Sequence, residues 1–99
     1  MSRTLVFRRE VASDLAAAII WYRNNRPGLG ADFQREFEAT VAAIERNPLQ
    51  YQVVERGMRR AILHGFPYAV MYTVLDQQIL IIGCRHFRQN PAEWRKRLE

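Results

Sequence analysis

The stretch YAVMYTVLDQQILIIGC at residues 68–84 decides the fold of this 99-residue chain. Two runs of β-branched and aromatic residues flank the polar pair Asp76-Gln77, a pattern typical of two antiparallel strands joined by a tight turn. Upstream, the runs YQVVE and MRRAILH have the same character and are bounded by Arg56-Gly57 and Gly65-Phe66-Pro67. The second half of the chain is therefore predicted to form a four-stranded antiparallel meander.

The first half of the chain has helical periodicity instead. Two segments repeat apolar residues at helical spacing, and they end at Asn24–Gly28 and at Asn47-Pro48. The repeating residues are Val11, Leu15, Ala18, Ile19 and Tyr22 in the first segment and Phe33, Phe37, Thr40, Val41 and Ile44 in the second. Thr4–Phe7 is predicted to be a short strand. Pro91–Leu98 is predicted to be a short helix, because Asn90 stands at its N-cap position and Pro91 at its first position.

The order of these elements indicates one α+β domain spanning residues 1–99. We expect an N-terminal strand, an α-helical hairpin packed on a small antiparallel β-sheet, and a short C-terminal helix. The hairpin is expected to cover one face of the sheet. The other face is expected to stay open and to carry function.

Arginine dominates the charge of the chain. The net charge is +5, and fourteen of the fifteen basic residues are Arg. Residues 51–99 hold eight basic groups against four acidic ones, so the excess lies in the predicted meander and the final helix. The guanidinium fork suits phosphate and carboxylate, which favours a nucleic-acid or acidic-protein partner. A high-GC genome that prefers Arg codons predicts the same count.

Several classes of function are disfavoured by what the sequence lacks. Cys84 is the only cysteine, so no intramolecular disulfide and no cysteine-based zinc site are expected. His64 and His86 do not have convincing metal-ligand spacing, and no glycine-rich nucleotide motif is present. We expect no metal, cofactor or small-molecule substrate. The sequence contains no signal-peptide-like or membrane-spanning segment, so we expect a soluble cytoplasmic protein with no membrane partner.

Strand alternation suggests where the cations point. It predicts Arg60, Ile62 and His64 on one face of their strand and Arg59, Ala61 and Leu63 on the other. In the last strand it predicts one face formed by Ile79, Ile81, Gly83 and Arg85 and the opposite face formed by Leu80, Ile82, Cys84 and His86.

Two hypotheses follow for the basic strand ends. A phosphate-binding cleft would use the Arg forks to hold a phosphate and His86 to shuttle a proton. Alternatively, these residues are solvated charges and a structural histidine. The aromatic residues Trp21, Tyr22, Phe33, Phe37 and Trp94 likewise form either a partner groove or ordinary core.

Taken in order, the motifs resemble the RelE/ParE superfamily of small type II toxins, and the similarity is greater to ParE, the group often called plasmid stabilisation proteins. The motifs that carry the resemblance are Trp21-Tyr22, Arg26–Gly30 leading into Phe33, Asn47-Pro48 with Tyr51, Arg59-Arg60, Phe66–Tyr72, and Cys84–His86 followed by Arg88, Asn90-Pro91 and Trp94. The resemblance implies a helical hairpin on an antiparallel sheet and a toxin neutralised by a cognate antitoxin.

The resemblance leaves the target open between DNA gyrase, which ParE-like members inhibit, and ribosomal mRNA, which RelE-like members cleave. A nuclease would use Arg60, Arg85 and His86. However, Ala69 stands where RelE-type nucleases commonly have an arginine, which favours the gyrase branch. The expected target-binding residues are Arg59, Arg85, His86, Arg88 and Trp94, and the expected antitoxin-binding residues are Trp21, Tyr22, Phe33 and Phe37. A third hypothesis is a non-toxic module that binds nucleic acid or antitoxin.

Overall fold

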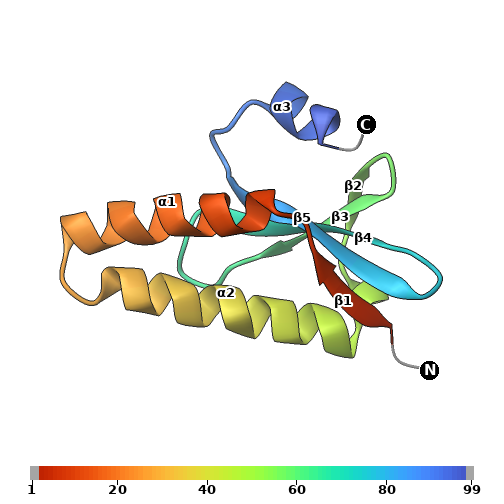
Figure 1. The fold of residues 1–99 in the computed structure, drawn as a ribbon, viewed down its shortest axis with the longest axis horizontal. Coiled ribbons are helices and arrows are strands. Elements are labelled where there is room, and N and C mark those ends of the chain that lie inside the picture. The colour runs from red at the N-terminus through yellow and green to blue at the C-terminus, as the bar shows by residue number, and fades with distance from the viewer. Residues whose placement is uncertain (1–2, 98–99) are drawn as a thin grey trace.

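The computed structural model describes residues 3–97, which form a helical hairpin packed on a five-stranded sheet (Figure 1). The elements are β1 Thr4–Phe7, α1 Glu10–Asn25, α2 Leu29–Arg46, a 3₁₀ turn Pro48–Gln50, β2 Val53–Glu55, β3 Met58–Ile62, β4 Tyr68–Val74, β5 Gln78–His86 and α3 Pro91–Lys96. The predicted α+β class and the predicted order of elements are confirmed. The predicted end of the last helix, Leu98, lies outside the described residues.

The sheet is mixed rather than purely antiparallel. Its strand order is β1-β5-β4-β3-β2, and β2 to β5 form the predicted antiparallel meander. β1 is the exception, because it runs parallel to β5, from Thr4 opposite Gln78 to Phe7 opposite Ile81. The hairpin carries the chain away from β1 to the far edge of the sheet. The meander then returns strand by strand until β5 lies beside β1.

The turn between the two helices depends on Pro27 and Gly28. Arg26 is extended, with φ of −159°, as the residue before a proline prefers, and α1 therefore ends at Asn25. Gly28 has φ of +87°, a left-handed conformation that a residue with a side chain adopts at a cost. The chain thus reverses within three residues, and α1 and α2 lie side by side against the sheet (Figure 1).

The main core fills the space between the hairpin and the sheet. α2 contributes Phe33 and Ile44, both fully buried, and the sheet contributes Val70, Tyr72 and Ile81. The buried Tyr72 hydroxyl donates a hydrogen bond of 2.6 Å to the carbonyl of Pro48, which ties the turn after α2 to the centre of the sheet. Burial raises the pKa of Tyr72 to about 12.

The second sheet face is covered, so the expectation of an open face is wrong. α3 lies on the side of the sheet away from the hairpin (Figure 1), and Trp94 is only 2% exposed there. Its ring belongs to a second apolar cluster with Met58, Ala69, Met71 and Ile82. Burial of this large indole among apolar side chains is favourable in free energy. This burial explains why a helix of only six residues stays docked on the sheet. We call this face the outer face and the hairpin side the inner face.

Tyr72→Phe tests how strongly the turn is tied to the sheet. We expect the free energy of unfolding at neutral pH to fall by about 1–2 kcal/mol, because the Pro48 carbonyl loses its buried donor. The raised pKa of Tyr72 means that the unfolded chain releases the phenolic proton first, so wild-type stability should decline as the pH rises from 10 toward 12. Urea unfolding at neutral and alkaline pH measures both effects.

Tyr51→Phe is the matched control, since Tyr51 packs edge-on against Tyr72 at 6.4 Å between ring centroids. Because it keeps the buried Tyr72 hydroxyl, it should retain the part of the alkaline decline that Tyr72→Phe removes. If the free energy of unfolding of wild type and Tyr72→Phe declined equally with rising pH, Tyr72 would not be the cause of the alkaline decline.

Candidate functional site

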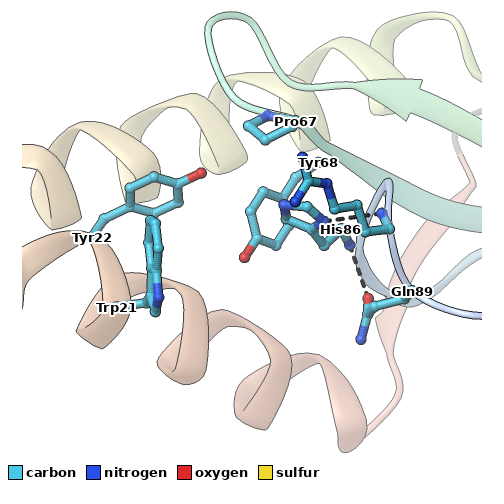
Figure 2. Close-up of a pocket in the computed structure, with 7 residues that line it drawn as sticks. Trp21, Tyr22, Pro67, Tyr68, His86 and Gln89 are labelled. Atoms are coloured by element: carbon cyan, nitrogen blue, oxygen red, sulfur yellow. Dashed lines mark hydrogen bonds between the residues drawn. The ribbon is translucent and has the colours of Figure 1, made fainter. Parts of the chain in front are cut away.

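A cavity of about 500 Å³ opens on the inner face between the C-terminal half of α1 and the loop that follows β5 (Figure 2). A second cavity of about 350 Å³ extends it toward the start of α1 and shares Trp21, Tyr68, His86 and Gln89 with it. We call the two together the α1 groove. The remaining lining residues are Tyr22, Pro67 and Arg88 in the first cavity and Ser13, Asp14, Ala17, Ala18 and Cys84 in the second.

One wall of the groove is a row of residues along α1. Ser13, Ala17 and Trp21 follow one another at intervals of four, so they lie on the same side of the helix. The first two are small and exposed, and Trp21 closes the row with 58% of its surface exposed. Tyr22 beside it is held by the core, because its ring stacks on Phe33 at 5.5 Å. The wall is therefore low along Ser13 and Ala17 and ends in two aromatic side chains, of which Tyr22 is held in place by the core.

The floor of the groove comes from β4 and β5. Tyr68 and His86 are direct neighbours across the two strands, and their rings meet edge to face with centroids 4.9 Å apart. Burial raises the pKa of Tyr68 and that of Tyr22 above the ordinary tyrosine value. Both hydroxyls therefore stay protonated at neutral pH and can donate hydrogen bonds to a ligand in the groove.

The opposite wall is the loop after β5, which is held together by short-range hydrogen bonds. His86 Nδ1 accepts the backbone N–H of Arg88 at 3.0 Å, and Gln89 Oε1 accepts the backbone N–H of His86 at 2.8 Å (Figure 2). This bond occupies Nδ1 of the imidazole, so Nε2 is the ring nitrogen that can contact a ligand in the groove. These bonds fix the backbone that presents the exposed Arg88 at the groove.

A β-bulge determines which side chains of β5 reach the groove. Met71 pairs with Gly83 but Tyr72 pairs with Ile81, so Ile82 is an extra residue without a partner on β4. The predicted face of Leu80, Ile82, Cys84 and His86 is therefore wrong. The extra residue shifts the alternation, and Cys84 joins Ile79 and Ile81 on the inner face. The strand glycine, Gly83, was the signal in the sequence that a bulge was possible.

The inner position of Cys84 fits a structural role. It is 3% exposed, and burial raises the pKa of its thiol to about 12. The thiol therefore stays protonated and is a poor nucleophile at neutral pH. Within residues 3–97, no group of three or more potential metal-ligating side chains is close enough to bind an ion. No helix in the same range is long and apolar enough to cross a membrane.

Asp14 of α1 joins the groove to the outer face. Its Oδ2 accepts the backbone N–H of Cys84 at 3.0 Å and Nη1 of Arg97 at 2.7 Å, while Oδ1 accepts Nη2 of Arg97 at 3.0 Å. The guanidinium also covers the Trp94 ring at 4.0 Å from the ring centre. The hydrogen bonds to Asp14 raise the pKa of Arg97. We call this arrangement the Asp14 clamp.

The structure does not bring the predicted cations together. Arg59 lies on the inner face at the end of α2, where it donates to the carbonyls of Tyr51 at 2.6 Å and Leu49 at 3.2 Å. Arg60 lies on the outer face and contacts Gln52 at 3.4 Å. The predicted placement of Arg59 and Arg60 on opposite faces of their strand is therefore confirmed, and the two arginines do not form one cluster.

The three residues expected in a nuclease site are also divided. Arg60 and Arg85 belong to the outer face, whereas the bulge turns His86 into the inner groove. Arg85 donates from Nη2 to the Gln89 carbonyl at 3.0 Å, and its Nε is buried without a partner among the described residues. These three side chains therefore do not line one cavity in this structure.

Three of the aromatic residues expected to bind partners are core residues. Phe33 and Phe37 of α2 are 0% and 5% exposed between the hairpin and the sheet, and Trp94 of α3 is buried against the outer face. Trp21 and Tyr22, in contrast, line the groove opposite His86 and Arg88. Sequence reasoning did not single out Tyr68, Gln89 or Asp14, because they meet in the groove only when α1 packs beside the end of β5.

The chain is similar to a known protein family and to solved structures. A family model described as the ParE toxin of the type II toxin-antitoxin system parDE matches residues 5–91. The fold is similar to that of a chain from the chromosomal ParDE toxin-antitoxin system of P. aeruginosa, with a TM-score of 0.78 and 20% identity over 86% of this chain and 96% of that one. It is also similar to a mutant of the E. coli toxin RelE in the free state, with a TM-score of 0.65 and 13% identity over 100% of both chains. No curated protein sequence matches the chain.

Gly83→Ala tests the packing of the bulge against the clamp. A Cβ on Gly83 would overlap the Asp14 carboxylate, the Trp94 ring and the Arg97 guanidinium, so α3 or α1 must shift. We expect the free energy of unfolding, measured by urea denaturation, to fall by about 1–3 kcal/mol. Gly28→Ala is the comparison, because a Cβ there meets open space and only its positive φ is unfavourable, at about 1 kcal/mol. A fully stable Gly83→Ala protein would contradict the close contact.

Proposed function

This chain belongs to the ParE toxin family of type II toxin-antitoxin systems, and on that premise we propose that it acts in the cytoplasm as a toxin that inhibits DNA gyrase and is neutralised by a cognate antitoxin. The observation that carries the proposal is the family match over residues 5–91, which spans nearly all of the described fold, including every residue that lines the α1 groove. The solved ParDE chain with the similar fold supports the architecture.

The α1 groove is the site that we propose for the antitoxin. Its floor and aromatic end are apolar, and protonated hydroxyls from Tyr22 and Tyr68 offer hydrogen bonds. The net charge of +5 and the exposed Arg88 favour an acidic segment. An amphipathic antitoxin segment that inserts an apolar side chain beside Trp21 and a carboxylate toward Arg88 would satisfy both features.

The target-facing residues lie within reach of the same groove. His86 and Arg88 line it, whereas the buried Trp94 supports the outer face and Arg59 lies at the other end of the molecule. We therefore restrict the proposed target contact to the neighbourhood of His86 and Arg88. An antitoxin segment seated in the groove would cover these residues, which provides a direct physical route to neutralisation.

Ribosome-dependent mRNA cleavage is the alternative function. It requires several groups around one phosphate, yet Arg60 and Arg85 lie on the face opposite His86. In addition, Ala69 is paired with Arg85, so the strand neighbour contributes no further cation. Both features favour gyrase inhibition by protein contact over cleavage.

The gyrase proposal is tested with the purified chain. We expect it to inhibit supercoiling of relaxed plasmid by DNA gyrase and to leave mRNA intact in a translation extract. Arg88→Glu should abolish most of the inhibition, because it reverses the exposed charge at the groove. Message cleavage with normal supercoiling would establish the alternative, and the absence of both activities would favour a non-toxic binding module.

The antitoxin site is tested by Trp21→Ala. Loss of this exposed indole should weaken binding of the antitoxin encoded beside the gene by about 2 kcal/mol, or roughly 30-fold, as expected for an aromatic hot spot. Ile20→Ala is the matched control, since Ile20 is adjacent and 46% exposed but does not line the groove. Calorimetric titration measures both affinities. Equal losses for the two variants would place the antitoxin elsewhere on α1.

A further inference from the structure

The edge of β5 that faces away from β4 has two different partners along its length. β1 pairs with it from Gln78 to Ile81, and the Arg8 amide makes the last bond of that side to the Ile81 carbonyl at 3.0 Å. Farther along, the Cys84 amide bonds to the Asp14 carboxylate instead of to a strand. A side chain from α1 thus closes the part of the edge that β1 does not reach.

The same carboxylate holds the end of α3. Arg97 binds Asp14 with both terminal nitrogens, and its backbone carbonyl accepts Nη1 of Arg8 at 2.6 Å. The two side chains of the ion pair are only 22% and 12% exposed, so solvent and salt screen this pair less than a surface pair. α3 is therefore tied to the hairpin as well as to the sheet.

The groove wall consists of residues 87–90, which connect β5 to α3. The hydrogen bonds between His86 and residues 88 and 89 tie the wall to the end of β5, and so does the bond from Arg85 Nη2 to the Gln89 carbonyl at 3.0 Å. One end is held where the Phe87 amide donates to the Pro67 carbonyl at 3.0 Å. The other end enters α3 at its N-cap residue, Asn90, whose side chain accepts the Ala92 amide. The wall is thus held at one end by β5 and at the other end by docked α3.

We propose that Asp14 is a positioning residue for the α1 groove: by clamping Arg97 it holds α3 on the outer face, and docked α3 holds residues 87–90 where they form the groove wall. A helix on one face of the sheet thereby orders a binding surface on the other. The proposal rests on the proposed function only in taking the groove as the antitoxin site. The ordering of the wall is a property of the free chain.

Hydrogen exchange of the free chain tests the ordering. Asp14→Asn removes the charge of the clamp with little change in size, and Arg97→Gln removes its other partner. In each variant we expect the amides of Arg88, Gln89 and Arg97 to exchange about tenfold faster or more through local opening, while the central amide of Val70 keeps its protection. The double variant should show less acceleration than the two single effects combined, because both changes break the same ion pair.

Tryptophan fluorescence gives a second readout of α3. In a Trp21→Phe background, Trp94 is the sole tryptophan, and it is buried in the docked helix. Asp14→Asn should shift its emission to the red and increase its quenching by acrylamide. If Asp14→Asn fails to fold, Arg97→Lys provides the test, since it retains the charge but cannot bind both carboxylate oxygens. It should give an intermediate effect on both readouts.

Glu55→Gln is the matched control. Glu55 pairs with Arg95 at 2.7 Å and ties α3 to β2, but that pair is more exposed and lies away from the groove. It should leave loop exchange and Trp94 quenching unchanged. Wild-type values in the Asp14 and Arg97 variants would overturn the proposal, as would equal effects from Glu55→Gln.

Antitoxin titration separates this inference from the proposed function. Asp14→Asn should weaken antitoxin binding in parallel with faster loop exchange. If Asp14→Asn speeds exchange in the loop but Trp21→Ala has no effect on antitoxin affinity, the groove is not the antitoxin site. The positioning role of Asp14 is supported in that case. If Trp21→Ala weakens binding and the loop stays ordered without the clamp, the positioning role of Asp14 is excluded.

Discussion

One extra residue in β5 sets the arrangement of both faces of the sheet. Because Ile82 has no partner on β4, Ile82 and Gly83 both lie toward α3, and Cys84 turns inward. Gly83 leaves space for the Trp94 ring, the Cys84 amide reaches the Asp14 carboxylate, and the following histidine enters the groove. With regular alternation, that histidine would face α3 and the groove would lose its floor.

The bulge also explains why two sets of residues with separate expected roles meet in one place. Trp21 and Tyr22 were expected to bind the antitoxin, and His86 and Arg88 were expected to bind the target. They form opposite sides of the same groove. Under the proposed function, an antitoxin segment in the groove would therefore cover the proposed target-binding residues without a large rearrangement. The positive charge, in contrast, is spread over both faces and both ends of the sheet, an arrangement that does not suit a single phosphate.

Local patterns were sufficient to predict the elements but not the site. The hairpin followed from the 3.6-residue periodicity and from Pro27-Gly28, and the α3 cap followed from Asn90-Pro91, because these signals act within a few residues. The parallel pairing of β1 and the role of Asp14 depend on contacts across about 70 residues, and the facing of His86 depends on a bulge in the pairing of β4 with β5. A period-two rule counts residues and cannot register a bulge, so one unpaired residue reversed the predicted facing of the strand end.

We propose that the antitoxin occupies the α1 groove and covers its far wall. The most direct measurement is a titration of the ¹⁵N-labelled chain with the antitoxin, followed by backbone and indole N–H resonances. We expect the largest changes at the Trp21 indole and at the amides of His86, Arg88 and Gln89. Changes confined to the outer face, at Arg60, Ile62 and α3, with the groove resonances unmoved, would contradict it.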